Sequence, residues 1–362
     1  MDSVFPMALP KDSVLAGQYI IDKALGQGGF GITYRAIDYR SNSFVAVKEF
    51  FPETMATRDG LTVVPFSGEA AQNFYYGMEQ FLDEARTLSE FIGNPNIVKV
   101  HRYFEENGTA YFVMDFVEGE SFDKYLKKRG GKIGYKEAER ILIHVVDALA
   151  AVHSKGIVHR DVTPDNIYIT STEDVRLLDF GAARYSLGDR SRSLDVVLKH
   201  GFAPKEQYSR HGKQGAFTDV YSLGATMYFA VTGIRPPDSI ERYDVDKMVP
   251  PSQLGVQITP TQEYALLKAM SVRAEDRFQD MIEFKAALLA GADIKTGPMM
   301  YCFNCGECIP ANSVFCTKCG TTQKEQVPTN SPAIRPANSG AGVIDKFKGL
   351  LKKDIKDILG KK

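Results

Sequence analysis

The chain has 362 residues, of which 44% are apolar and 25% charged, and its formal net charge is −1. This composition is typical of a globular protein of two or three domains and gives no sign of a basic nucleic-acid-binding domain, so we expect no nucleic-acid partner. The N-terminus lacks the basic and apolar regions of a secretory signal, and the longest nearly apolar run, 220–231, is too short to span a bilayer. We therefore expect a cytoplasmic protein.

The first strand pattern of the chain surrounds a glycine-rich sequence. Residues 1–17 contain Pro6, Pro10 and Gly17, and we expect them to form a poorly packed tail. β-type residues then flank the sequence LGQGGFG at 25–31. A helix after a GxGxxG motif would indicate a dinucleotide fold, whereas a strand suits a hairpin whose backbone closes over nucleotide phosphates. Taken alone, the motif fits a glycine-rich surface turn equally well.

The chemistry of the chain is concentrated in two motifs near its middle. The sequence HRDVTPDN at 159–166 is followed thirteen residues later by Asp179-Phe180-Gly181. Phosphoryl transfer needs one carboxylate to receive a hydroxyl proton, and a carboxylate plus an amide oxygen to hold magnesium. The two motifs resemble the catalytic and magnesium-binding loops of the eukaryotic-like (Hanks-type) bacterial Ser/Thr protein kinases.

This resemblance implies an α+β, bilobal kinase fold, with a β-rich N-lobe at 18–116 and a helical C-lobe at 117–291. It implies that Asp161 takes the proton of the acceptor hydroxyl and that Asn166 and Asp179 hold Mg²⁺ or Mn²⁺. The implied reaction is transfer of the γ-phosphoryl group of ATP to Ser/Thr hydroxyls of protein substrates in signalling, including autophosphorylation.

The same resemblance assigns the other ATP contacts. Phe44–Lys48 is similar to the strand that ends in the phosphate-binding lysine, and a helical apolar pattern at 78–91 places Glu84 as its partner. Other carboxylates near this helix are alternatives to Glu84, namely Glu79, Asp83 and Glu90. Backbone groups near Asp115 and Val117 resemble an adenine-binding hinge. The phosphate-covering loop would use Leu25, Gly26, Gly28 and Gly31.

An insertion longer than most kinases show, residues 50–77, separates the lysine from its helix. Its Asp59-Gly60 pair lies between β-type residues and predicts a small hairpin. Hydrophobic periodicity predicts further strands at 97–100 and 111–114 and helices at 121–128 and 135–154.

Two positions depart from the usual Ser/Thr-kinase pattern. A lysine that contacts the γ-phosphate normally stands where this chain has Thr163, and a threonine normally stands near the position of Lys199. We therefore predict that the two residue types have exchanged places. On this hypothesis the Lys199 ammonium reaches Asp161 or the γ-phosphate.

The segment from Asp179 to Glu206 resembles a kinase activation segment. It contains three candidate phosphorylation sites, Ser186, Ser191 and Ser193. Arg160 would supply a positive pocket for a phosphoserine, although a polar flexible loop is the alternative. By the same resemblance, Glu206 is expected to pair with Arg277, and Asp219 to brace the catalytic-loop backbone.

All five cysteines lie between 302 and 319, and four of them form a C-x2-C-x10-C-x2-C pattern: Cys302, Cys305, Cys316 and Cys319. Two CxxC turns supply the four thiolates that a structural Zn²⁺ needs. The segment 299–322 therefore resembles a zinc ribbon, with Cys308 left over. Iron in a rubredoxin-like site, or thiols with no shared metal, are the alternatives.

The end of the chain changes character twice. Residues 323–342 are rich in Pro, Ser, Asn and Thr and predict a disordered linker. Residues 343–362 repeat apolar residues at helical spacing among seven lysines and three aspartates, a net charge of +4. Such a basic amphipathic helix binds an anionic membrane surface or a partner's groove, which would make the protein peripheral at a membrane. Docking on its own kinase domain is the alternative.

Two other functions compete with an active protein kinase. The first is a nucleotide-binding pseudokinase scaffold whose C-terminal segments are the effectors. The retention of all five core residues argues against it: Lys48, Glu84, Asp161, Asn166 and Asp179. The second is a kinase that acts on a small molecule, which the activation-segment pattern and Asp219 disfavour.

Overall fold

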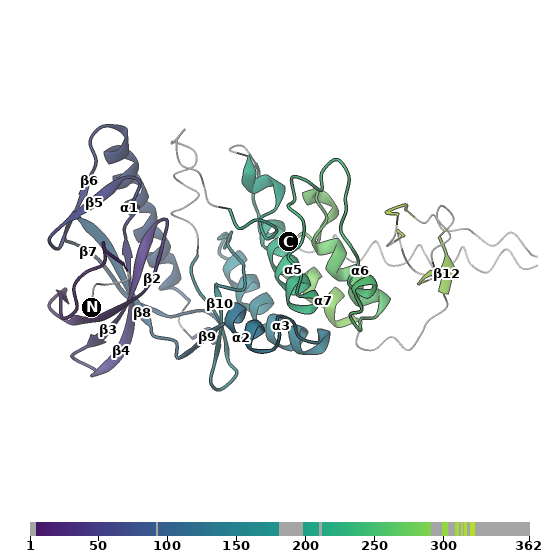
Figure 1. Ribbon diagram of the computed structural model, residues 1–362, viewed down its shortest axis with the longest axis horizontal. Coiled ribbons are helices and arrows are strands. Elements are labelled where there is room, and N and C mark those ends of the chain that lie inside the picture. The colour runs from purple at the N-terminus through teal and green to yellow at the C-terminus, as the bar shows by residue number, and fades with distance from the viewer. Residues whose placement is uncertain are drawn as a thin grey trace, which may run out of the picture.

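The computed structural model describes residues 5–91, 93–180, 198–209 and 212–290, together with 299–302, 308–310, 313, 315–316 and 319–322. The three candidate phosphoserines, Cys305, the predicted linker and the predicted final helix lie outside these ranges. Figure 1 shows a β-rich lobe and a helical lobe. Strands β12 (Met299–Tyr301) and β13 (Cys308–Pro310) follow the helical lobe in the chain and pair with each other.

The N-lobe is built on a six-stranded antiparallel sheet in the order β1-β2-β3-β4-β8-β7. Its strands are β1 (Val14–Leu15), β2 (Tyr19–Gly28), β3 (Gly31–Asp38), β4 (Ser43–Phe50), β7 (Val100–Glu106) and β8 (Thr109–Asp115). Helix α1 (Glu69–Leu88) packs on this sheet (Figure 1). The interface is aromatic: Phe81 lies 5.6 Å from Phe50 and 4.9 Å from Phe112 between ring centroids. Burying these rings fixes the helix that carries Glu84 against the strand that carries Lys48.

The insertion between β4 and α1 contains the predicted hairpin. It is shorter than the expected residues 50–77, because α1 begins at Glu69. Strands β5 (Ala56–Asp59) and β6 (Thr62–Pro65) pair across Gly60, whose φ of +60° suits glycine. The helix expected at 78–91 instead begins at Glu69, nine residues earlier. Gly77 weakens the helical pattern there, but Phe74 is fully buried against Phe50, and that packing outweighs the low propensity of glycine.

The expectation of a poorly packed N-terminal tail is wrong for the described residues 5–17. Leu9 and Leu15 are 4% and 1% exposed, and β1 pairs with β2. The tail is attached through polar groups: the Leu9 amide donates to the Tyr34 hydroxyl at 3.0 Å, and Arg58 donates to the Met7 carbonyl at 2.6 Å. These long-range partners cannot be read from local periodicity.

A buried carboxylate connects the tail, the insertion and the sheet. Glu49 is fully buried and accepts hydrogen bonds from Tyr34 (2.6 Å), Tyr111 (2.7 Å) and the guanidinium of Arg58 (2.6 Å). Burial and this carboxylate raise the pKa of both tyrosines, so both remain donors. The charge of Glu49, beside Lys48 in sequence, is thus balanced by Arg58 from the insertion.

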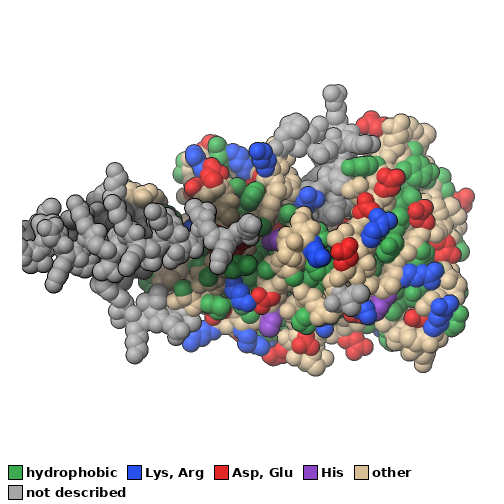
Figure 2. All heavy atoms as spheres, turned by 180° about the vertical axis from the view of Figure 1, so that it is seen from behind, with side chains coloured by type: hydrophobic (Ala, Val, Ile, Leu, Met, Phe, Trp, Pro, Cys, Tyr) green, Lys and Arg blue, Asp and Glu red, His purple; other side chains and the backbone are tan. Residues whose placement is uncertain are grey.

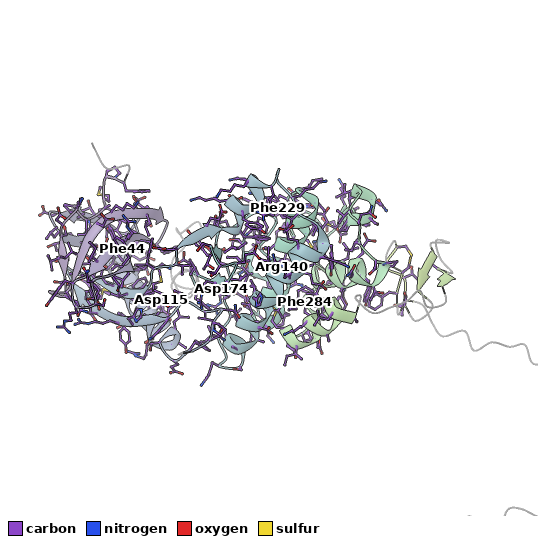
Figure 3. The ribbon with its side chains drawn as sticks, turned by 90° about the horizontal axis from the view of Figure 1, so that it is seen from below. Phe44, Asp115, Arg140, Asp174, Phe229 and Phe284 are labelled. Atoms are coloured by element: carbon purple, nitrogen blue, oxygen red, sulfur yellow. The ribbon has the colours of Figure 1, made fainter. Side chains whose placement is uncertain are left out.

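The C-lobe is helical, and its most enclosed helix is α5 (Ala216–Thr232), in which nearly every residue is buried. Around it lie α2 (Phe122–Lys128), α3 (Tyr135–His153), α6 (Pro260–Ala269) and α7 (Met281–Ala290). The shorter elements are β9 (Gly119–Ser121), β10 (Ile167–Thr170), β11 (Val175–Leu177), η2 (Lys205–Tyr208), η3 (Pro251–Leu254) and η4 (Ala274–Asp276). Figure 3 places Phe44 and Asp115 in the N-lobe and Arg140, Phe229 and Phe284 in the helical lobe.

The strand expected at 97–100 begins only at Val100. Ile97 instead forms an isolated parallel bridge with Leu177 of β11, so its apolar run belongs to the junction between the lobes. The described part of the chain contains no helix that is both long and apolar enough to cross a membrane. Acidic and basic side chains are intermixed on the face in Figure 2, which gives that face no single sign of charge.

Candidate active site

The catalytic loop is held by an aspartate from the enclosed helix. The Asp219 carboxylate, fully buried at the start of α5, accepts from the backbone amides of His159 (2.8 Å) and Arg160 (2.7 Å) and pairs with His153 at 2.7 Å. Arg160 has a φ of +70°, an uncommon conformation for a non-glycine residue, and these bonds stabilise it. The predicted bracing role of Asp219 is confirmed.

His159 links this loop to the loop that contains Asp179. Its Nε2 lies 3.0 Å from the Leu178 carbonyl, while its Nδ1 lies 3.3 Å from the amide of Asp161. A neutral ring with the proton on Nε2 satisfies both contacts. Burial lowers the pKa of His159 and outweighs the opposing effect of nearby carboxylates. The ring also packs on Phe180, with centroids 4.4 Å apart.

We expect this histidine to make the two-lobed region less stable in mild acid. Because its folded-state pKa lies below the ordinary value near 6.5, the unfolded chain takes up the proton first, and stability falls as pH drops below about 6.5. Between pH 7.5 and 5.5 the loss is limited to about 1.4 kcal/mol, or roughly 3 °C in melting temperature. Thermal unfolding followed by circular dichroism should show a smaller fall for His159→Phe. An equal fall in both proteins would contradict the assignment.

Lys48 reaches the site from β4, and its direct partner is Asp179. The Lys48 Nζ lies 2.8 Å from Asp179 Oδ1. Burial acts to lower the pKa of Lys48, but the carboxylates of Asp179, Glu84 and Asp161 raise it overall. Burial likewise opposes the charge of Asp179, yet the Lys48 ammonium holds the pKa of that carboxyl below its usual range. Both groups are charged near neutral pH.

Glu84, the predicted partner of Lys48, lies on α1 and is 7% exposed. It acts on Lys48 through its charge, whereas the short ion pair of Lys48 is made with Asp179. The structure thus brings the three residues into one electrostatic cluster, from β4, from α1 and from the loop after β11.

Asn166 is oriented as a metal ligand would need to be. Its Nδ2 donates to the carbonyl of Asp161 at 2.8 Å, so its Oδ1 is the atom left to face a cation. Leu178 donates its amide to the Asn166 carbonyl at 2.9 Å, which ties the two loops together. An amide oxygen and the Asp179 carboxylate are the hard oxygen donors that Mg²⁺ prefers, so these residues fit the ion.

The glycine-rich loop forms the predicted hairpin, since Gly28 pairs with Gly31 where β2 meets β3. A side chain at Gly31 would place its Cβ 2.3 Å from the Glu49 carbonyl, so only glycine fits beneath this strand. Leu25 is 43% exposed on β2. Asp115 ends β8 and pairs with His101 at 2.7 Å. The adenine contacts of Asp115 and Val117 remain predictions.

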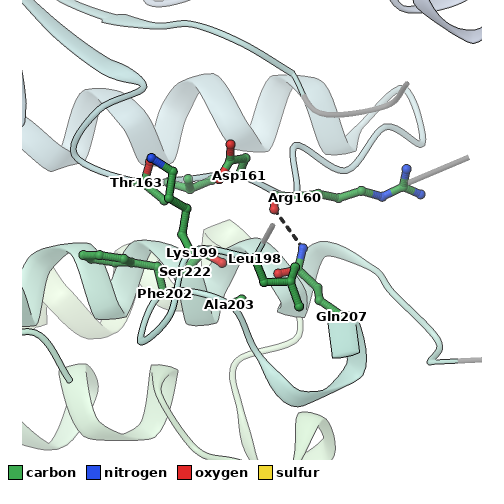
Figure 4. A pocket seen from close by; sticks show the side chains of 10 residues that line it. Arg160, Asp161, Thr163, Leu198, Lys199, Phe202, Ala203, Gln207 and Ser222 are labelled. Carbon is green, nitrogen blue, oxygen red and sulfur yellow. Dashed lines mark hydrogen bonds between the residues drawn. The ribbon is translucent and has the colours of Figure 1, made fainter. Parts of the chain in front are cut away.

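Thr163 and Lys199 line one small pocket together with Asp161, the predicted catalytic base (Figure 4). Thr163 is 1% exposed, and its hydroxyl oxygen has no hydrogen-bond partner among the described residues. Lys199 extends from its own segment toward the catalytic loop, where its Nζ donates to Asp165 Oδ2 at 2.8 Å. The ammonium thus reaches the catalytic loop, but the partner that the structure gives it is Asp165, which the sequence did not indicate.

The predicted ion pair between Glu206 and Arg277 is confirmed. The guanidinium donates to both carboxylate oxygens, at 2.7 and 3.1 Å, and its side chain is fully buried. Its remaining hydrogen bonds are to backbone carbonyls, including those of Ser271 (2.7 Å) and Val272 (2.9 Å) just after α6. Glu206, at the end of the activation segment, is therefore anchored by a bidentate buried pair.

Three of the four predicted zinc ligands lie together. The Sγ atoms of Cys302, Cys316 and Cys319 are all within 4.8 Å of one another. Cys302 and Cys316 are buried and Cys319 is exposed. Gly320, with a φ of +68°, donates its amide to the Cys316 carbonyl at 2.9 Å and closes the second turn. A cluster of thiols of this kind fits a soft divalent cation.

Comparison with known proteins agrees with this geometry. Residues 19–288 match the family described as protein kinase domain. The chain is 28% identical over 277 residues to a probable serine/threonine-protein kinase of Clostridium acetobutylicum, covering 75% of this chain and 39% of that protein. It is 30% identical over 290 residues to the serine/threonine-protein kinase PknA of Nostoc, covering 77% and 48%. The solved structure "PpkA-294 apo form" superposes with a TM-score of 0.69 at 34% identity, covering 78% of this chain and 99% of that one. The chain thus spans less than half the length of these two relatives.

Proposed function

The chain belongs to the protein kinase family, and we propose that it transfers the γ-phosphoryl group of ATP to serine and threonine hydroxyls of proteins. The observation that carries this proposal is the joining of the two lobes at one site. Lys48 of the N-lobe pairs with Asp179, while Asn166 is bonded to the backbone of Asp161. These contacts support the proposal that a phosphate-binding cation, two oxygen ligands for Mg²⁺ and a carboxylate base act together in one site.

In this mechanism, positioning and charge neutralisation supply the rate. Asp161 orients the acceptor hydroxyl and takes its proton. Lys48, supported by the charge of Glu84, holds the ATP phosphates, and the backbone at Gly26, Gly28 and Gly31 excludes water above them. When bound to Asn166 and Asp179, Mg²⁺ would neutralise developing phosphate charge. The Asp219 brace keeps the base in place.

Lys199 supplies the charge that Thr163 lacks. The usual lysine of the catalytic loop is absent, and Lys199, in the described part of the activation segment, reaches the same loop. Its ion pair with Asp165 is half-exposed, with 43% and 53% of the two side chains accessible, so exchanging that carboxylate for a phosphate oxygen costs little. We assign Lys199 to γ-phosphate stabilisation on this basis.

The C-terminal segments serve targeting and stability in this proposal. The cysteine cluster holds a structural Zn²⁺ through four thiolates, with Cys305 as the fourth. The basic segment 343–362 binds an anionic membrane surface or a groove on a partner protein, which places the kinase at the periphery of a membrane or in a complex.

The proposal is tested by incubating the purified chain with Mg²⁺ and [γ-³²P]ATP, alone and with generic protein acceptors. Label should appear in the chain and the acceptors, disappear when Mg²⁺ is removed, and be recovered as phosphoserine or phosphothreonine after acid hydrolysis. A nucleotide-binding scaffold would bind ATP, as a dye-displacement assay would show, yet incorporate no more label than a chain with Asp161→Asn.

A further inference from the structure

The cysteine-rich segment contacts the kinase C-lobe through an aromatic side chain. Phe315 packs on Tyr264 of α6, with ring centroids 5.3 Å apart. Lys268, one helical turn further along α6, places its Nζ 5.9 Å from the centre of the Phe315 ring. Burial raises the pKa of the partly buried Tyr264 to about 12.

The contacting ring is tied to the cysteine cluster by the backbone. Phe315 immediately precedes Cys316 and forms a bridge with Thr322. The Cys316 amide donates to the Thr321 carbonyl at 2.8 Å, which closes the turn that presents Cys316 and Cys319. Ligation of these thiols would therefore fix the direction in which the Phe315 ring projects.

Lys268 also contacts Phe278, the residue that follows Arg277. Its Nζ lies 4.7 Å from the centre of the Phe278 ring, and Phe278 is joined to Arg277 in the chain. Arg277 is held by the Ser271 and Val272 carbonyls after α6 and grips Glu206. Lys268 is thus a cation shared between a ring of the cysteine-rich segment and a ring beside the anchor.

We infer that metal loading of the cysteine cluster regulates the kinase by stabilising α6 and, through Lys268 and Arg277, the anchor of the activation segment at Glu206. The regulator is a soft divalent cation, for which Zn²⁺ is the probe. A metal that binds only the folded state stabilises that state by its binding free energy. The folded state of the cysteine-rich segment includes its packing on α6, so the metal would stabilise that packing as well. Loss of the metal would break the contacts that Phe315 makes with Tyr264 and Lys268 and expose both side chains to solvent.

The test uses the full chain, which contains no tryptophan, so Phe315→Trp introduces a single fluorescent reporter at the contact. A chelator selective for Zn²⁺ over Mg²⁺ is expected to release about one Zn²⁺ per chain, measured with a colorimetric indicator. The tryptophan emission should then shift to the red. The melting temperature of the unsubstituted chain should fall by about 3 °C or more.

Variants of Phe315 and Lys268 test whether the metal acts on the kinase domain through these two side chains. Lys268→Ala and, separately, Phe315→Ala should keep the metal but lose most of the chelator-induced fall in melting temperature, whereas Lys247→Ala, at an exposed lysine of the same lobe, should respond like the unsubstituted chain. Full Zn²⁺ release with unchanged melting and emission would overturn the inference, as would an undiminished response in Lys268→Ala.

Of these measurements, only the rate of label transfer depends on the proposed kinase function. Zn²⁺ removal is expected to slow label transfer several-fold in the unsubstituted chain, and Lys268→Ala is expected to be slow with or without the metal. The melting and emission arms need no turnover and can be run on Asp161→Asn, so failure of the coupling and failure of the kinase proposal give different results.

Discussion

Replacing Asp161 by asparagine is expected to lower phosphoryl transfer about 10³-fold, because the amide cannot accept the proton of the acceptor hydroxyl. The substitution is nearly isosteric. The backbone amide of Asp161 still lies beside His159 and its carbonyl still accepts from Asn166, so the loop should keep its shape. The measurement is the initial rate of ³²P transfer at saturating ATP, with the melting temperature as the check on folding.

A measurement of ATP affinity distinguishes a loss of the catalytic base in Asp161→Asn from a general defect of the nucleotide site. Lys48 and Asp179, not Asp161, form the cross-lobe pair at the site, so Asp161→Asn should bind ATP within about threefold of the unsubstituted chain. Lys48→Met is the matched comparison, since it removes a phosphate contact and should weaken ATP binding as well as transfer. Retention of more than about a tenth of the rate by Asp161→Asn would remove Asp161 from the role of base.

The placement of the candidate catalytic residues could be predicted from the sequence because they lie in short runs of consecutive residues. The spacing from Asp161 to Asn166 is set within one loop, and Asp179 follows a short strand, so their relative positions need little knowledge of distant contacts. The bracing role of Asp219 and the Glu206–Arg277 ion pair were predicted from the family resemblance, and the observed contacts confirm both.

The contacts that the sequence did not reveal are long-range ones. Glu49 gains its partners from two other strands and the insertion, and nothing in its local sequence distinguishes it from an exposed strand glutamate. The start of α1 at Glu69 depended on the burial of Phe74, which required the sheet to be present. The contact of Lys199 with Asp165, 34 residues away in the chain, is likewise a long-range one.

Lys199→Thr is expected to lower the transfer rate about 10²-fold, the cost of removing one group that stabilises developing charge. Thr163→Lys alone should also be slow, because a second ammonium would be buried in the pocket that Lys199 already lines. The double variant Thr163→Lys/Lys199→Thr relieves that repulsion and restores a cation beside Asp161. It should recover most of the rate, a coupling that a double-mutant cycle measures directly.

Asp165→Asn distinguishes a catalytic lysine from a structural one. If Lys199 acted only by pairing with Asp165, removing that carboxylate would reproduce the loss seen in Lys199→Thr. If Lys199 stabilises the γ-phosphate, Asp165→Asn removes only a half-exposed ion pair, worth about 1 kcal/mol or less, and the rate should change less than about fivefold. The decisive comparison is the double exchange. A Thr163→Lys/Lys199→Thr chain that melts like the unsubstituted one but transfers no faster than Lys199→Thr would show that the lysine and the threonine have not traded roles.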